Sequence, residues 1–136
     1  SFNETKSSDE IQNITLTKKD IRALNALSCS KTVPKYQEFN SLIGLEFFKN
    51  LRVLDLSGSK INNSSIIDII NLKELRELDL SNTNIKLSSD LSELAYLSNS
   101  SYFPNLNYLT LDDSFKDTQI VNEIKNIHPG IVIEFK

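Results

Sequence analysis

The sequence contains one histidine and one cysteine, the side chains that most often act as a general base or a nucleophile near neutral pH. His128 directly precedes Pro129-Gly130, a pair typical of turns, so we interpret it as a turn residue without a catalytic role. Cys29 lies near Lys31, which would favour a thiolate, but a cysteine in an apolar neighbourhood is more often inert. One histidine and one cysteine do not provide a zinc site, and three glycines do not suggest a phosphate-binding loop. We therefore expect no enzymatic activity, no metal and no cofactor.

The length and charge of the chain restrict the classes of partner. The chain has 136 residues, enough for one domain with a single core. It has 15 Lys and Arg residues against 18 Asp and Glu residues, a formal net charge of −3. This balance shows no basic footprint for nucleic acid or anionic lipid, and no apolar run approaches the roughly 18 residues of a membrane span. We expect another protein as the partner, and neither nucleic acid nor membrane.

Internal repeats organise the second half of the chain. The segment 51–61, LRVLDLSGSKI, is matched 24 residues later by the segment 75–85, LRELDLSNTNI. A third copy, LNYLTLDD over 106–113, follows 31 residues later, and IVIEF over 131–135 is a shortened fourth copy. The shared pattern is LxxLxLxx(S/T)x(I/L), in which leucines recur at fixed places.

This pattern, at a period in the twenties, resembles the leucine-rich-repeat family over roughly Leu45 to Phe135. The segment 128–133, HPGIVI, is similar to closing repeats of ribonuclease-inhibitor-like and F-box-associated proteins. The resemblance implies an α/β leucine-rich-repeat solenoid, with a parallel sheet on the concave face and short helices on the convex face. We expect about four to five parallel strands.

The chain departs from the family pattern at two positions of the repeat. Where the family usually has Asn or Cys at the ninth position, the copies have Ser59, Thr83 and Ser114, whose hydroxyls could still bond loop backbone. At the apolar eleventh position the third copy has Lys116, and the neighbouring Phe115 could fill the gap.

The periodicity supports this fold independently of the resemblance. Each copy alternates leucine with other residues, the period-two pattern of a strand with one buried face. Between the strands the spacing becomes helical. We expect short helices beginning near Ser64, near Ser88 or Ser89, and at Thr118, the last one ending at Pro129-Gly130. The third helix would turn inward Ile120, Ile124 and Ile127.

The domain boundaries follow from where the pattern holds. Residues 1–10 are polar, and we expect them to be disordered. The leucine-rich-repeat domain would cover 11–136, with an N-terminal cap and an irregular first repeat over 11–50, and the regular repeats with the closing strand over 51–136.

The structure of the N-terminal cap has two interpretations. We favour a strand over 11–16 followed by a helix from Thr17, where TKKD resembles a capping box. The segment 24–29, LNALSC, also fits the strand of the repeat, but both segments cannot be full repeats only 13 residues apart. A further helical segment is expected over 36–48.

Equivalent positions of stacked repeats form columns, because neighbouring strands lie about 4.8 Å apart. Positions three, five and seven of LxxLxLx should point to the concave face. The candidate binding residues are therefore Val53, Asp55, Ser57, Glu77, Asp79, Ser81, Tyr108, Thr110 and Asp112. Because these columns contain carboxylates and no Lys or Arg, we expect a partner with a basic surface. Tyr108 would supply an apolar contact.

The acidic columns also have a structural interpretation. Asp55 and Asp79 would face each other across neighbouring strands, and like charges so placed cost a few tenths of a kcal/mol. Such a cost could be retained for a ligand. Alternatively, the carboxylates are merely solvated and are offset by Arg52 and Arg76 in the adjacent column.

The leading functional hypothesis is a protein–protein interaction module, an adaptor or substrate-recognition domain. A single cysteine cannot form an internal disulfide, which favours an intracellular location. The alternatives are a secreted or cell-surface recognition protein and a non-catalytic module of a larger enzyme such as a ubiquitin ligase. Glycans on Asn63 or Asn99, two of the Asn-x-Ser/Thr sequons, would distinguish the secreted class.

Overall fold

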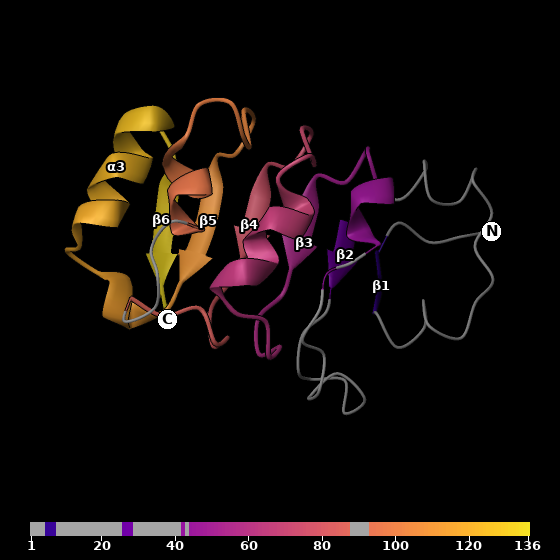
Figure 1. Ribbon diagram of the computed structural model, residues 1–136, viewed down its shortest axis with the longest axis horizontal. Coiled ribbons are helices and arrows are strands. Elements are labelled where there is room, and N and C mark those ends of the chain that lie inside the picture. The colour runs from indigo at the N-terminus through magenta and orange to yellow at the C-terminus, as the bar shows by residue number, and fades with distance from the viewer. Residues whose placement is uncertain (1–4, 8–25, 29–41, 43, 88–92) are drawn as a thin grey trace.

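The computed structural model describes residues 5–7, 26–28, 42, 44–87 and 93–136. Six strands form one sheet, in which each strand pairs in parallel with the next one along the chain (Figure 1). The strands are β1 (Thr5–Ser7), β2 (Ala26–Ser28), β3 (Val53–Asp55), β4 (Glu77–Asp79), β5 (Tyr108–Leu111) and β6 (Val132–Phe135). This is the parallel α/β arrangement that the repeat pattern predicts, with six strands among the described residues where four to five were expected.

The register of the sheet aligns the copies position by position. Leu54 pairs with Leu78, Leu78 with Leu109, and Leu109 with Ile133. Asp55 accordingly lies beside Asp79, as the column argument predicted.

Short helical segments connect the strands. They are the 3-10 helices η2 (Leu45–Phe47), η3 (Asn63–Ile69), η4 (Leu94–Ser98) and η5 (Asp113–Phe115), and the α-helix α3 (Gln119–Ile127). Contacts link η2 to η3, η3 to η4, and η4 to α3, so these segments form a row that accompanies the sheet (Figure 1). Within the described ranges, no helix has both the length and the apolar character needed to cross a bilayer.

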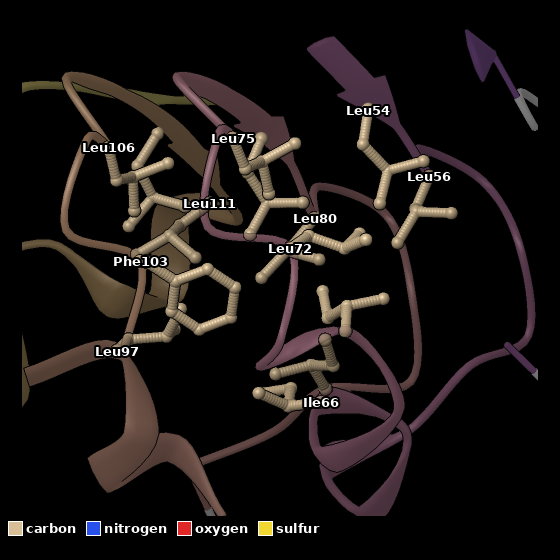
Figure 2. Packing of buried hydrophobic residues seen from close by; sticks show 14 of the residues in the cluster. Leu54, Leu56, Ile66, Leu72, Leu75, Leu80, Leu97, Phe103, Leu106 and Leu111 are labelled. Atoms are coloured by element: carbon tan, nitrogen blue, oxygen red, sulfur yellow. The ribbon is translucent and has the colours of Figure 1, made fainter. Parts of the chain in front are cut away.

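The hydrophobic core contains the leucines of the three full copies (Figure 2). All of their LxxLxL leucines are buried: Leu51, Leu54, Leu56, Leu75, Leu78, Leu80, Leu106, Leu109 and Leu111. In the fourth copy the equivalent residues, Ile133 and Phe135, are only partly buried. Among the described strands, β6 pairs only with β5. The side chains of Ile133 and Phe135 are therefore not covered by a following described strand.

The ninth and eleventh positions behave largely as predicted. Ser59 and Thr83 are buried, and their hydroxyls donate to the carbonyls of the residues three positions earlier, at 2.7 and 2.8 Å. In the third copy Phe115 is buried and Lys116 is exposed, so the phenylalanine fills the apolar place. Ser114 is exposed and does not take the buried position of the other two hydroxyls.

The starts of the helical segments differ from prediction in detail. η3 begins after Asn62 and not at Ser64, because the Asn62 side chain accepts from the Ser64 N–H at 3.1 Å while Ser65 Oγ accepts from the Asn62 N–H at 3.2 Å. α3 begins after Thr118 as expected. Ile127 in its last turn is 38% exposed and not inward, and the next residue, His128, is buried. Of the helix expected from Ser88 or Ser89, η4 is the part within the described residues.

The N-terminal interpretation needs correction. The repeat strand is Ala26–Ser28, within the alternative segment 24–29, because it is this strand that pairs in register with Val53–Asp55. The favoured strand over 11–16 and the helix from Thr17 lie outside the described residues. Thr5–Ser7 forms a strand within the segment expected to be disordered, since it pairs with β2. Of the helical segment expected over 36–48, the described part contains the short turn η2.

Candidate binding site on the open face of the sheet

A hollow of about 290 Å³ lies on the face of the sheet opposite to the core, which we call the open face. Residues of β3, β4, β5 and β6 line it. Six of the predicted binding residues are among them: Val53, Asp55, Glu77, Asp79, Tyr108 and Thr110. Their side chains alternate with the buried leucines, so positions three and five of the repeat share this face, as predicted.

Position seven of the three full copies does not contribute to the hollow. Ser57, Ser81 and Asp112 do not line it. Strands β3 and β4 end at position five, so the chain has already turned when it reaches position seven. Ser81 is 3% exposed and donates its hydroxyl to Asp79 at 2.6 Å, so it cannot present its side chain to a partner. The third column therefore lies outside the hollow, and a binding role for Ser57 and Asp112 stays a prediction.

The two repeated aspartates have a structural role in the turns that follow their strands. Asp55 Oδ1 accepts from the Ser57 N–H at 2.9 Å, and Asp79 Oδ1 accepts from the Ser81 N–H at 2.9 Å. Both are Asx turns, in which the side chain replaces a backbone acceptor. Both copies share the sequence Asp-x-Ser at these turns, and this short motif is the signal that predicts them. The two aspartates therefore stabilise the turns after their strands and are not merely solvated charges.

Lysines lie beside two of the carboxylates. Lys136 Nζ is 3.7 Å from Asp79 Oδ2, and Lys86 Nζ is 3.7 Å from Asp112 Oδ2. Asp112 also accepts from the backbone N–H of Asn82. The expected partners, Arg52 and Arg76, are exposed and form no ion pair with the described residues. Since both lysine side chains are more than half exposed, we expect each pair to contribute about 0–1 kcal/mol.

Glu134 of the fourth copy and Lys136 after it are two lining residues that the sequence argument missed. Glu134 and Lys136 line the hollow, and Glu134 lies beside Thr110 in register. The Tyr108 hydroxyl donates to Glu134 Oε2, and this hydrogen bond is the main cause that raises the pKa of Tyr108. Glu134 occupies position five of its copy, so the column rule would have found it if applied to the clipped repeat.

His128 follows the last residue of α3 and precedes a turn at 129–130, and it is buried. It is 6% exposed, and its Nε2 lies 2.8 Å from the carbonyl oxygen of Leu97, which joins the end of α3 to η4. Among the described residues, no group of three or more His, Cys, Asp or Glu side chains could hold a metal ion. The contact assigns His128 a role in packing.

We therefore expect His128→Ala to lower the free energy of unfolding by about 1–3 kcal/mol, because the Leu97 carbonyl would lose its buried partner. Urea denaturation followed by circular dichroism measures the change. Asn126→Ala, at an exposed site of the same helix, is the control and should change stability by less than about 0.5 kcal/mol. Equal stability of the two variants would contradict the packing role.

Asn63, one of the two sequons considered as glycan sites, is buried and hydrogen-bonded. It is 5% exposed, its Nδ2 donates to the Lys86 carbonyl at 3.1 Å, and its Oδ1 accepts from the Lys86 N–H at 2.9 Å. A glycan on Asn63 is incompatible with these contacts in the folded chain. Asn99 is exposed, so a glycan on this residue would still distinguish a secreted protein.

The similarity of this chain to known proteins is distant. No protein-family model matches the sequence, and no curated protein matches it. Among solved structures, the chain is similar to an internalin from Listeria monocytogenes str. 4b F2365, with 22% sequence identity and a TM-score of 0.41. The alignment covers 87% of this chain and 45% of the internalin chain, so this chain spans less than half of that protein. The similarity identifies neither a partner nor an activity.

Proposed function

We propose that this chain is a leucine-rich-repeat protein-interaction module, an adaptor or substrate-recognition domain, that binds a partner through the open face of its sheet. The observation that supports this most is the hollow, to which four consecutive strands contribute side chains. A concave region with both apolar and polar lining is the usual form of a recognition site. The proposal assigns no catalytic step to the chain.

The charge of the hollow favours a partner with a basic surface. Its walls carry the carboxylates of Asp55, Glu77, Asp79 and Glu134. Lys136 is the cation among the residues that line it. Excess negative charge attracts a positively charged partner, accelerates its approach and makes association sensitive to salt.

A test must separate the charge of the aspartates from their role in the turns. Replacing Asp55 and Asp79 with lysine would remove the acceptors of the Ser57 and Ser81 N–H groups together with the charge. Asparagine keeps an Oδ1 acceptor at the same place and removes the charge alone. The informative variant is therefore Asp55→Asn with Asp79→Asn.

We expect this double variant to keep its stability within about 1 kcal/mol and to bind a nona-lysine peptide at least about fivefold more weakly at low salt. Isothermal titration calorimetry at two salt concentrations measures the affinity and its salt dependence. The matched control is Glu74→Gln with Glu123→Gln, which removes the same charge at two exposed sites that do not line the hollow. If both double variants weaken binding equally, net charge alone attracts the peptide, and the proposed site is wrong.

A further inference from the structure

Thr110 combines burial with an unused hydroxyl. It lies in β5 between Leu109 and Leu111, which belong to the core, so its side chain points to the open face, where it lines the hollow. It is nevertheless 3% exposed. Its backbone carbonyl accepts from the Leu80 N–H at 2.9 Å, but within the described part of the chain its hydroxyl forms no hydrogen bond.

Thr83 shows what a buried threonine ordinarily does in this fold. It is 4% exposed, almost as buried as Thr110. Its hydroxyl donates to the Leu80 carbonyl at 2.8 Å and accepts from the Ile85 N–H at 3.3 Å. A buried hydroxyl without such a partner destabilises the folded state. We therefore expect a ligand to supply the hydrogen bond that the Thr110 hydroxyl lacks within the described residues.

The surroundings of Thr110 specify the charge of that ligand. Asp79 and Glu134 are its neighbours in register on either side, and both line the hollow. Tyr108 lies two residues earlier on the same face. Thr110 thus lies in the hollow between two residues with carboxylates, and Tyr108 is on the same face. Such a set of acceptors fits a positively charged group that donates several hydrogen bonds.

We propose that the hollow seats the guanidinium group of an arginine side chain from the partner, in contact with Thr110. This rests on the proposed function, in which a basic partner docks on the open face. Guanidinium is preferred to ammonium because its five N–H donors form a planar fork that can meet several acceptors at once and can stack on a tyrosine ring. Its stem would lie along Val53, which also lines the hollow.

Lys136 of the chain itself would compete with the arginine for the carboxylate of Asp79. Its Nζ lies 3.7 Å from Asp79 Oδ2, and its side chain is 55% exposed. An amine so exposed can leave Asp79 at little cost when a stronger set of donors arrives. The arriving guanidinium takes over the carboxylate and adds the contact with Thr110 that Lys136 does not make.

The test titrates N-acetyl-arginine amide into the isotope-labelled protein and follows amide chemical shifts by NMR. We expect saturable shifts around Thr110, binding of N-acetyl-lysine amide at least about fivefold weaker, and no binding of the uncharged citrulline analogue. Thr110→Val should weaken arginine binding at least about fivefold, the effect of one lost hydrogen bond. Its Tm should be equal to or above that of the parent, because the valine replaces an unpartnered hydroxyl.

Two further variants make the result decisive. Thr110→Ser keeps the hydroxyl and should retain arginine binding. Thr83→Val removes a hydroxyl of equal burial that is already bonded, so it should lower the Tm and leave the affinity unchanged. If Thr110→Val binds arginine as tightly as the parent, or has a lower Tm than the parent, the proposed arginine site is wrong. If Thr110→Val leaves arginine binding unchanged but the Asp55→Asn, Asp79→Asn variant binds the basic peptide more weakly, the proposed function stands without the arginine site. If neither variant changes binding, both the arginine site and the proposed function are wrong.

Discussion

Replacing Leu80 with alanine is expected to lower the free energy of unfolding by about 2–5 kcal/mol, the usual range for a buried leucine. Leu80 is 2% exposed and belongs to the same core as Leu56, which is completely buried at the equivalent place of the preceding copy (Figure 2). The loss has two parts, the transfer of the removed methyl groups and the cavity that remains. Neighbouring repeats fill the space on both sides, so we expect little collapse around the gap.

Urea denaturation with circular dichroism measures this loss, and Ile67→Ala is the matched control. Ile67 is 50% exposed on η3, so its truncation removes little buried surface and should cost less than about 1 kcal/mol. A cost below about 0.5 kcal/mol for Leu80→Ala would mean that the register of the repeat is wrong.

The second large effect is expected at a polar residue. Asn63→Ala should lower the free energy of unfolding by about 2–4 kcal/mol, because the Lys86 N–H and carbonyl would both lose their partner, at about 1–3 kcal/mol for each group. These bonds join η3 to the loop that follows the next copy. They therefore act between repeats in the way that a backbone ladder does.

Asn84→Ala provides the comparison for this prediction. Asn84 is exposed, and its Nδ2 donates to the Lys60 carbonyl at 3.3 Å, so its truncation should cost less than about 1 kcal/mol. Differential scanning calorimetry of the two variants ranks them directly. An Asn63→Ala variant that melts no lower than Asn84→Ala would show that the buried amide does not hold the repeats together.

The sequence predicted the strands where the leucine pattern is complete. β3, β4 and β5 lie on LxxLxL copies, because one buried face needs only a period of two. The first strands could not be chosen in this way. Ala26–Ser28 is a strand because it pairs with Val53–Asp55, and Thr5–Ser7 because it pairs with β2. Pairing with another segment is not visible in a local pattern. The pairing supports the alternative strand within 24–29, while the favoured strand and helix lie outside the described residues.

The candidate site was predictable in position and not in detail. Counting along the repeat placed Asp55 and Asp79 on one face, and the register confirms that they are neighbours. The same counting failed at Ser81, because the strand ends two residues earlier. It also could not reveal that Thr110 is buried on the open face. That burial depends on side chains contributed by other strands, and no single repeat contains the information.

His128 shows a similar limit. Its place before Pro129-Gly130 correctly suggested the end of a helix, since α3 ends at Ile127. The acceptor of its ring is the carbonyl of Leu97, 31 residues earlier. A contact across that distance depends on how α3 docks against η4, which periodicity does not describe.

The order of the strands has a consequence for how the chain unfolds. Each described strand bonds only to the strands before and after it in the sequence, and none of the described strands closes the sheet by returning to the other end. In such an arrangement cooperativity passes from neighbour to neighbour, so stability is a sum of local and nearest-neighbour contributions. Opening can therefore begin at an outer strand and move inward while the central strands still protect their amides from exchange with solvent. A destabilising substitution at one end of the sheet should have little effect on the stability of the other end. A single melting temperature would then describe the most stable part of the chain and not the whole chain.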